Sequence, residues 1–154
     1  EVLKSNEENI ESLLPNADVI ILAAAIKGKL APKLIKLSDY QILKKGALLV
    51  DVSIDQGGSI ENIHVSKEEE LVFEENGIMH YAVDHMASFK PIMASNKLSK
   101  ETLKFGLKIA NLGILGALND IDALLYGLTT FWGYVTNKDL AEVHGLTYQI
   151  YDLI

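Results

Sequence analysis

An aspartate that precedes two glycines is the feature of this sequence best suited to chemistry. The apolar stretch 47–53 leads directly into Asp55, and Gly57-Gly58 follow after one residue. A carboxylate at the end of a strand can exchange protons with a substrate if its surroundings tune its pKa. The same side chain could instead cap a turn through nearby backbone amides, and paired glycines alone predict a turn or a close backbone approach. Both interpretations of Asp55 are open at this point.

A second candidate lies at Asp84 and His85, which follow another apolar stretch at 78–83. An imidazole can donate a hydrogen bond or a proton near neutral pH. His85 could equally be a neutral side chain that completes a loop. The residue type alone does not separate the two.

The elements that must position these side chains are predicted strands and helices of an α/β fold. Residues 17–25 and 47–53 are continuous apolar runs with β-branched side chains, typical of strands buried on both faces of a parallel sheet. A predicted helix over 37–45, with Ser38 as its N-cap, separates them and implies a right-handed crossover. Ligands bind at the carboxyl ends of such strands. The segments 24–28, 53–58 and 83–86 are therefore expected to lie together.

Beyond Ser99 the pattern changes to a long helical periodicity, with Ser99 as the expected N-cap. Three aromatic residues, Phe131, Trp132 and Tyr134, are expected to pack against this helix. The other predicted elements are a short helix after Ser5-Asn6 that ends at Pro15, strands at 70–73 and 78–83 around a turn at 74–77, and helices at 120–125 and 136–144.

Composition excludes several classes of function. The 154 residues include no cysteine, which removes disulfides and thiolate chemistry and fits a cytoplasmic location. A net charge of -7 would repel phosphate backbones, so we expect no nucleic-acid partner. The longest apolar run, 19–26, is far shorter than the roughly 20 residues of a membrane-spanning helix, so we expect no membrane association.

Four segments together resemble alanine dehydrogenases: 50–58 with its Asp-Gln-Gly-Gly motif, 31–34, 81–83 and 136–146. The resemblance covers nearly the whole chain. It implies an oxidoreductase that interconverts L-alanine with pyruvate and ammonia and uses NAD as its cofactor. It also implies the carboxy-terminal half of a Rossmann-type parallel sheet followed by C-terminal helices. The expected domains are 1–93, the second half of the NAD-binding domain, and 94–154, a helical segment of the substrate domain.

The same resemblance implies the residues of the site. Asp55 corresponds to the family's catalytic aspartate beside the nicotinamide. The other positions that resemble cofactor-binding residues are Ser5 on the adenosine side, Ala24 and Ala25 by their backbone, Val52, Ser53 and Ile54 before the aspartate, and Val83, Asp84, His85 and Met86 in the loop over the nicotinamide.

Three departures from the family pattern bear on the function. His85 stands where alanine dehydrogenases generally carry asparagine, and Val83-Asp84-His85-Met86 is more like relatives that act on carboxyalkyl amino acids or saccharopine. His64 replaces a nucleotide-contacting arginine, which removes a permanent charge. Lys108 and Leu112 occupy positions where some members hold a divalent ion, and a protonated lysine is not a cation ligand. We therefore expect no metal.

The sequence contains no G-x-G-x-x-G motif for a pyrophosphate, and the family's substrate-binding residues lie in an amino-terminal part. We expect this chain alone to be inactive and to associate as a homo-oligomer, because half a sheet has an apolar strand edge. Two alternatives to an alanine dehydrogenase are open. One is a dehydrogenase of different substrate or a transhydrogenase component, and the other is a non-catalytic remnant that serves as an interaction module.

Overall fold

The computed structural model describes residues 2–26 and 28–149, so residue 27 of the predicted segment 24–28 lies outside the described part. The chain forms two compact units, and the boundary along the sequence lies between Met86 and Ala87. The first contains a mostly parallel sheet and the second is mainly helical, which confirms the α/β class. The assignment of 1–93 and 94–154 to two different domains stays a prediction.

The sheet of the first unit has the strand order β1-β2-β4-β3. β1 is parallel to β2, with Leu22 opposite Asp51, and β2 is parallel to β4, with Val50 opposite Tyr81. The carboxyl ends of these three strands therefore lie at one edge of the sheet. The bounds of the strands are Val19–Leu22 for β1, Leu48–Asp51 for β2, Phe73–Glu75 for β3 and Ile78–Tyr81 for β4.

The predicted chain reversal between the last two strands is confirmed, but the bounds are shifted, because Glu74 and Glu75 belong to β3 and the strand predicted at 70–73 contributes only Phe73. β3 and β4 form an antiparallel hairpin across Asn76 and Gly77, whose φ angles of 55° and 78° are left-handed. Asparagine and glycine are the residues that adopt this conformation most readily. The local sequence thus determines where the chain reverses.

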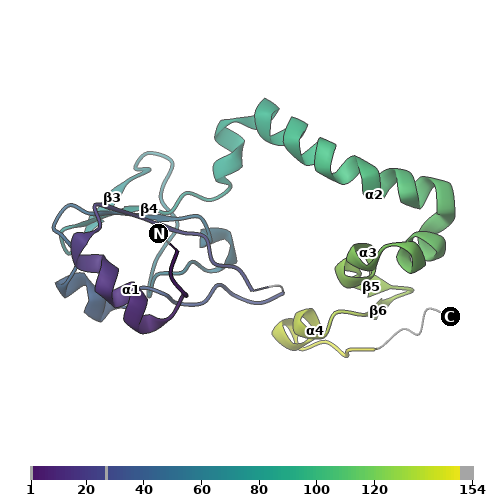
Figure 1. Cartoon of the computed structure of the whole chain (residues 1–154), viewed down its shortest axis with the longest axis horizontal. Coiled ribbons are helices and arrows are strands. Elements are labelled where there is room, and N and C mark those ends of the chain that lie inside the picture. The colour runs from purple at the N-terminus through teal and green to yellow at the C-terminus, as the bar shows by residue number, and fades with distance from the viewer. Residues whose placement is uncertain (1, 27, 150–154) are drawn as a thin grey trace. The chain divides into compact units, whose positions relative to one another are not determined.

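The first helix, α1 (Glu7–Leu13), is also close to its prediction and lies in the same unit as the sheet (Figure 1). The side chain of Asn6 caps it by accepting a hydrogen bond from the amide of Asn9 at 2.8 Å. A 3-10 turn, η1 (Leu14–Asn16), ends it at the predicted proline. Ile10 of α1 packs against the core. The core consists of Leu14, Leu22, Ile35, Tyr40, Leu43, Leu49, Ile60 and Ile78.

The predicted helix over 37–45 is wrong in type and in its cap. The segment is a short 3-10 helix, η2 (Leu37–Gln41), and its N-cap is Lys36 rather than Ser38. The Asp39 carboxylate accepts the Lys36 amide at 2.8 Å, and the Asp39 carbonyl accepts the amide of Ile42 at 3.0 Å. These bonds close the chain into a tight turn, so a regular helix does not extend to residue 45.

The expectation that β1 is buried on both faces is wrong. Val19 is 54% exposed and Ile21 is 67% exposed, whereas Leu22 is buried. Val19 and Ile21 are two residues apart and therefore lie on one face of β1, and the described residues do not cover that face. An apolar run identifies a strand, but burial of its second face requires another element to pack there.

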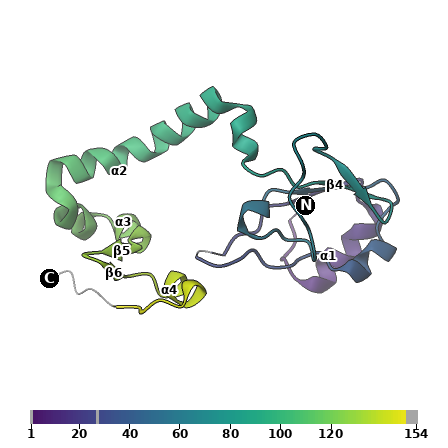
Figure 2. The same cartoon turned by 180° about the vertical axis from the view of Figure 1, so that it is seen from behind.

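The long helix begins earlier than predicted. This helix, α2 (Pro91–Asp120), starts at Pro91, because proline is favoured in the first helical turn, so Ser99 is an interior residue and not the N-cap. Gly113, with φ 69°, breaks the helical backbone and kinks α2. Figure 2 shows the smaller elements gathered at the kinked end of α2. They are α3 (Asp122–Gly127), β5 (Thr130–Phe131), β6 (Tyr134–Val135) and α4 (Lys138–His144).

The last helix confirms its predicted stop. The Asn137 side chain accepts the amide of Leu140 at 2.9 Å and caps α4, and Gly145 ends the helix with a left-handed φ of 63°.

Trp132 is 79% exposed in the turn between β5 and β6, so the predicted packing against the long helix is wrong for this residue. Among the described helices, none is both long enough and apolar enough to cross a membrane.

His80, in the middle of β4, is a histidine with no exposed surface. Its ring stacks on Phe73 with centroids 5.1 Å apart, and its Nε2 lies 3.3 Å from the Tyr40 hydroxyl. Nδ1 has no hydrogen-bond partner among the described residues. Burial lowers the pKa of His80, which Glu75 opposes and His64 reinforces. Burial also raises the pKa of Tyr40 to about 12, so its hydroxyl remains protonated.

We predict that the buried imidazole makes the first unit less stable in acid. Below the ordinary histidine pKa of 6.5 the unfolded chain binds a proton at His80 that the folded chain does not, so the free energy of unfolding falls with pH until the lowered folded pKa is reached. Urea unfolding from pH 8 to pH 5 measures this. His80→Gln should flatten the dependence, and the same change at the exposed His144 should not. Equal slopes for the two variants would contradict the prediction.

Candidate active site at the carboxyl edge of the sheet

Asp55 lies where the sequence predicted, just beyond β2 at the carboxyl edge of the sheet. It belongs to the 3-10 turn η3 (Ile54–Gln56) and its side chain is exposed. Directly before it, the Ser53 hydroxyl donates a hydrogen bond of 2.8 Å to the Ala24 carbonyl. This bond ties the residues after β2 to those after β1. The predicted segments 24–26 and 53–58 are therefore brought together.

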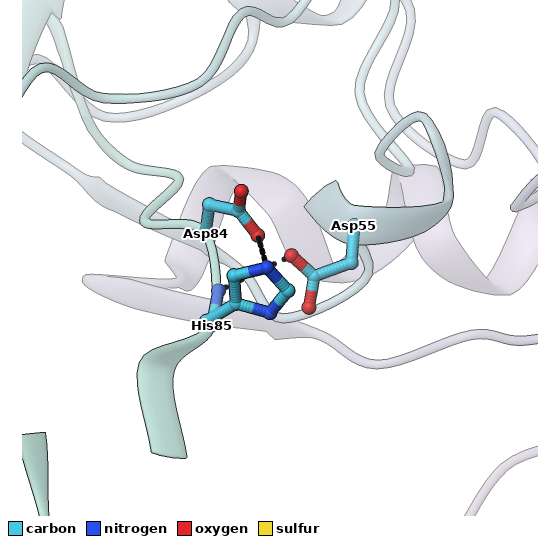
Figure 3. A group of neighbouring side chains, drawn as sticks. All are labelled: Asp55, Asp84 and His85. Carbon is cyan, nitrogen blue, oxygen red and sulfur yellow. Dashed lines mark hydrogen bonds and ion pairs between the residues drawn. The ribbon is translucent and has the colours of Figure 1, made fainter. Parts of the chain in front are cut away.

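Asp55, Asp84 and His85 form one cluster, in which the imidazole lies beside the two neighbouring carboxylates (Figure 3). The backbone amide of His85 donates to Oδ1 of Asp55 at 3.2 Å. The Nε2 atom of His85 lies 3.3 Å from Oδ1 of Asp84. Because β2 and β4 are neighbouring parallel strands, the loops that follow them meet here.

The carboxyl groups of Asp55 and Asp84 shift each other's pKa in opposite directions. A hydrogen bond with Asp84 lowers the pKa of Asp55, burial opposes this, and the amide and ring of His85 add to the lowering. The same hydrogen bond with Asp55 raises the pKa of Asp84. The pair therefore separates into an acceptor, Asp55, and a partner that keeps its proton longer, Asp84. Neighbouring carboxyl groups with separated pKa values are a recurrent arrangement for acid–base chemistry.

The backbone of His85 has a left-handed conformation, with φ 51°. Asparagine, aspartate and histidine are the non-glycine residues most enriched in this region, whereas β-branched residues rarely adopt it. Histidine and asparagine at position 85 are thus both compatible with the same backbone. The loop constrains which residues fit at position 85 independently of their chemistry.

The turn after β2 is capped by Asp51 and not by Asp55. The Asp51 carboxylate has no exposed surface and accepts the amides of Ser53 at 3.0 Å and Ser59 at 2.7 Å. The sequence had left turn capping open as the role of Asp55. Since Asp51 has that role, the Asp55 side chain projects outward and contacts the loop after β4.

Both glycines of the Asp-Gln-Gly-Gly motif are required by the backbone. Gly57 and Gly58 have φ angles of 87° and 72°. A Cβ atom on Gly58 would lie 2.4 Å from the Cγ2 atom of Ile63 and 2.9 Å from Oδ2 of Asp51. Glycine is therefore needed here for the fold of the loop itself.

The remaining predicted site residues differ in exposure. Val52 and Ala25 are exposed, Ala24 and Met86 are half-buried, and Ile54 and Val83 are buried, so the last two face the interior and act by packing. Ser5 is exposed before α1, next to a pocket of about 160 Å³ that Lys33 and Leu34 also line.

Asp51 and Lys33 are the residues whose roles the sequence did not reveal. The available signals were an acid inside an apolar strand and a lysine within a motif.

The cluster also has the spacing of a cation site, since Asp55, Asp84 and His85 each offer one ligand atom within 4.8 Å of the others. All three are exposed, and exposed acidic groups commonly gather without an ion. Lys108, at the position where some family members hold a metal ligand, instead forms an ion pair with Asp120 at 2.7 Å. The expectation that no metal is bound stays a prediction.

A mostly parallel sheet whose loops meet at the carboxyl ends of its strands defines the class of open-sheet α/β proteins, in which ligands bind at that edge. The family model for the alanine dehydrogenase/PNT C-terminal domain matches residues 1–138, and the chain belongs to this family. Alanine dehydrogenase 1 of Staphylococcus aureus strain NCTC 8325 / PS 47 is 36% identical over 148 residues, which cover 96% of this chain and 40% of that protein. The protein of the same name from strain Mu50 gives the same values.

A solved structure of an L-alanine dehydrogenase superposes with a TM-score of 0.72 at 33% sequence identity. The superposition covers 92% of this chain and 39% of that chain. The chain thus spans about 40% of the length of the curated relatives it matches.

We predict that Asp84→Ala raises the pKa of Asp55 toward its ordinary value, because the hydrogen bond that mainly lowers it is lost. Carboxyl carbon chemical shifts followed against pH by NMR measure the change. Asp18→Ala is the matched control, because Asp18 is an exposed aspartate that pairs with Lys44. A pKa of Asp55 that stays the same or falls in the Asp84 variant would contradict the coupling.

Proposed function

We propose that this chain contributes the catalytic aspartate and the nicotinamide-facing edge of an NAD-dependent alanine dehydrogenase. The observation that carries the proposal is the cluster of Asp55 with Asp84 and His85 at the carboxyl edge of the parallel sheet. Membership of the alanine dehydrogenase/PNT family supports it, as do relatives named alanine dehydrogenase. The reaction would be the oxidative deamination of L-alanine to pyruvate and ammonia, and its reverse.

The residues at this edge fit the flat nicotinamide ring of a dinucleotide. Ala24 and Ala25 have minimal side chains and leave space next to the backbone after β1. The Asp55 and His85 side chains are exposed at the same edge, so polar groups are accessible to a ligand. His64, where the family usually has an arginine, stacks on Phe73 with ring centroids 4.1 Å apart. It therefore packs within the unit rather than providing a guanidinium for a phosphate.

NAD supplies the acceptor for the hydride that leaves the substrate carbon. In the proposed mechanism Asp55, with its lowered pKa, is an ionised acceptor that orients the substrate amine and takes a proton as the imine is hydrolysed. Asp84, whose pKa their shared hydrogen bond raises, can accept that proton from Asp55, which restores the ionised Asp55 carboxylate. The His85 amide holds Oδ1 of Asp55 in place during these transfers. Proton transfer therefore requires only small movements of side chains.

The activity requires more residues than this chain holds. The chain spans 40% of the relative's length, and residues 1–149 contain no glycine-rich pyrophosphate turn. We propose that L-alanine and pyruvate are the substrates of a version completed to the length of its relatives. We also propose a homo-oligomer, because the exposed apolar face of β1 at Val19 and Ile21 favours association.

For the completed enzyme we predict that Asp55→Asn lowers kcat by about a hundredfold or more, the usual contribution of a general acid–base group. Asparagine keeps the shape of the side chain but does not accept a proton at neutral pH. The dissociation constant for NAD should change little, because the carboxylate acts in the chemical step. Steady-state kinetics and NAD titration measure both quantities. A variant with the kcat of the parent enzyme would exclude this role for Asp55.

The pairing of His85 with Asp84 favours a second candidate, a dehydrogenase of the same fold that acts on carboxyalkyl amino acids or saccharopine. The Nε2 atom of His85 lies 3.3 Å from Asp84, so this loop presents an imidazole and a carboxylate together. Such a pair changes both the shape and the protonation of a substrate pocket. Alanine remains our primary proposal, because the Asp-Gln-Gly-Gly motif and the named relatives support that branch.

The two candidates predict different effects of His85→Asn in the completed enzyme. If alanine is the substrate, kcat/KM for alanine should change by less than about tenfold, because asparagine fits the left-handed backbone at this position. If the substrate is bulkier, the parent enzyme should prefer lysine- or saccharopine-type compounds, and the variant should shift toward alanine. Measurement of kcat/KM for both substrate classes with both forms distinguishes these outcomes.

A further inference from the structure

Lys33 contacts the Asp-Gln-Gly-Gly loop in a way that the catalytic proposal does not use. Its Nζ donates to the carbonyls of Gly57 at 2.7 Å, Gly58 at 2.8 Å and Ile60 at 3.0 Å. A lysine ammonium has three donors and no acceptor, so this tripod uses its full capacity. Lys33 therefore holds three backbone oxygens that would otherwise repel one another.

Asp51 binds the same loop with the opposite polarity. Its two carboxylate oxygens accept the amides of Ser53 and Ser59, on either side of Asp55. The ammonium of Lys33 binds carbonyls and the carboxylate of Asp51 binds amides, so each charge meets the matching end of the peptide dipole. Hydrogen bonds to charged groups contribute more than neutral ones.

The backbone of the segment that carries Lys33 completes the attachment. The amide of Ala31 donates to the Gln56 carbonyl at 2.9 Å, and the amide of Leu34 donates to the Ser59 carbonyl at 2.7 Å. Between these two donors stand Pro32, which has no amide hydrogen, and Lys33, whose side chain takes over the intervening carbonyls. The segment 31–35 is thus joined to residues 56–60, the second part of the loop 53–60.

We propose that Lys33 and Asp51 are positioning residues, which together form a clamp that holds the loop 53–60 and so fixes the place of Asp55. The catalytic consequence rests on the proposed function of Asp55. The structural consequence, a rigid loop, does not depend on it. The proposal therefore has two tests within this chain and one test of turnover.

The first test is hydrogen exchange at the Ser53 and Ser59 amides of the full chain, resolved by NMR. Lys33→Met keeps the aliphatic stem but removes the ammonium, and exchange at both amides should become about tenfold faster or more, as expected for the loss of charge-assisted hydrogen bonds. Lys44→Met is the matched control, because Lys44 pairs with the exposed Asp18 carboxylate. Unchanged exchange in the Lys33 variant, or equal acceleration throughout the core, would overturn the clamp.

The second test is chemical rescue, which a general loss of stability would not show. Lys33→Ala leaves the three carbonyls without their donor, and added methylammonium should restore slow exchange at Ser53 and Ser59. Tetramethylammonium at the same concentration has the same charge but no N–H donor, so it should not. Equal effects of the two salts, or none from methylammonium, would overturn the tripod role of Lys33.

In the completed enzyme, Lys33→Met and Asp51→Asn should each lower kcat by about tenfold or more, with KM for NAD nearly unchanged, because they displace Asp55 without removing it. A lower kcat that methylammonium restores in the Lys33→Ala enzyme would support positioning. If the parent completed enzyme does not oxidise alanine, the proposed function fails, and the exchange measurements still decide the clamp. If the parent is active and the clamp variants keep its kcat, the positioning role is wrong.

Discussion

The buried carboxylate of Asp51 is the constraint on which the rest of the candidate site depends. Hydrogen bonds must offset the free-energy cost of removing a carboxylate from water, and here two amides of one loop supply them. To reach both oxygens, the chain has to curl back over the end of β2 between Ser53 and Ser59. That curl brings Gly58 so close to Asp51 that a Cβ atom would not fit. It also turns the loop carbonyls toward Lys33 and leaves Asp55 at the outer surface.

The loop after β4 supplies the groups that contact the Asp55 carboxylate and lower its pKa. β2 and β4 are adjacent and parallel, so the residues after each strand meet although about thirty positions separate Asp55 from His85. This contact gives two chemically similar carboxyl groups different pKa values, because the shared hydrogen bond lowers the pKa of Asp55 and raises that of Asp84. Rigid attachment on one side and a polar neighbour on the other are what a proton-transferring carboxylate needs.

At position 85, in the loop after β4, the residue must fit the backbone conformation and also provides a polar side chain. The left-handed backbone at position 85 limits the residue types that fit, and histidine and asparagine are both among them. A change between them would alter the polar groups of the loop at little conformational cost, because both residues fit the same backbone.

Local interactions made much of this protein predictable from its sequence: apolar β-branched runs identified the parallel strands, Asn6 and Gly145 marked helix ends, and Asn76-Gly77 marked the hairpin. The motif around Asp55 likewise indicated the family and the edge of the sheet that holds the site. The turn at Asp39 is made by local hydrogen bonds that the helical periodicity did not reveal. The exposed face of β1 depended on tertiary structure. So did the contact of Asp55 with Asp84 and the clamp of Lys33 and Asp51. The physical reason is that these features are made by groups far apart in the sequence, or by the presence or absence of a packing neighbour, and no local pattern encodes either.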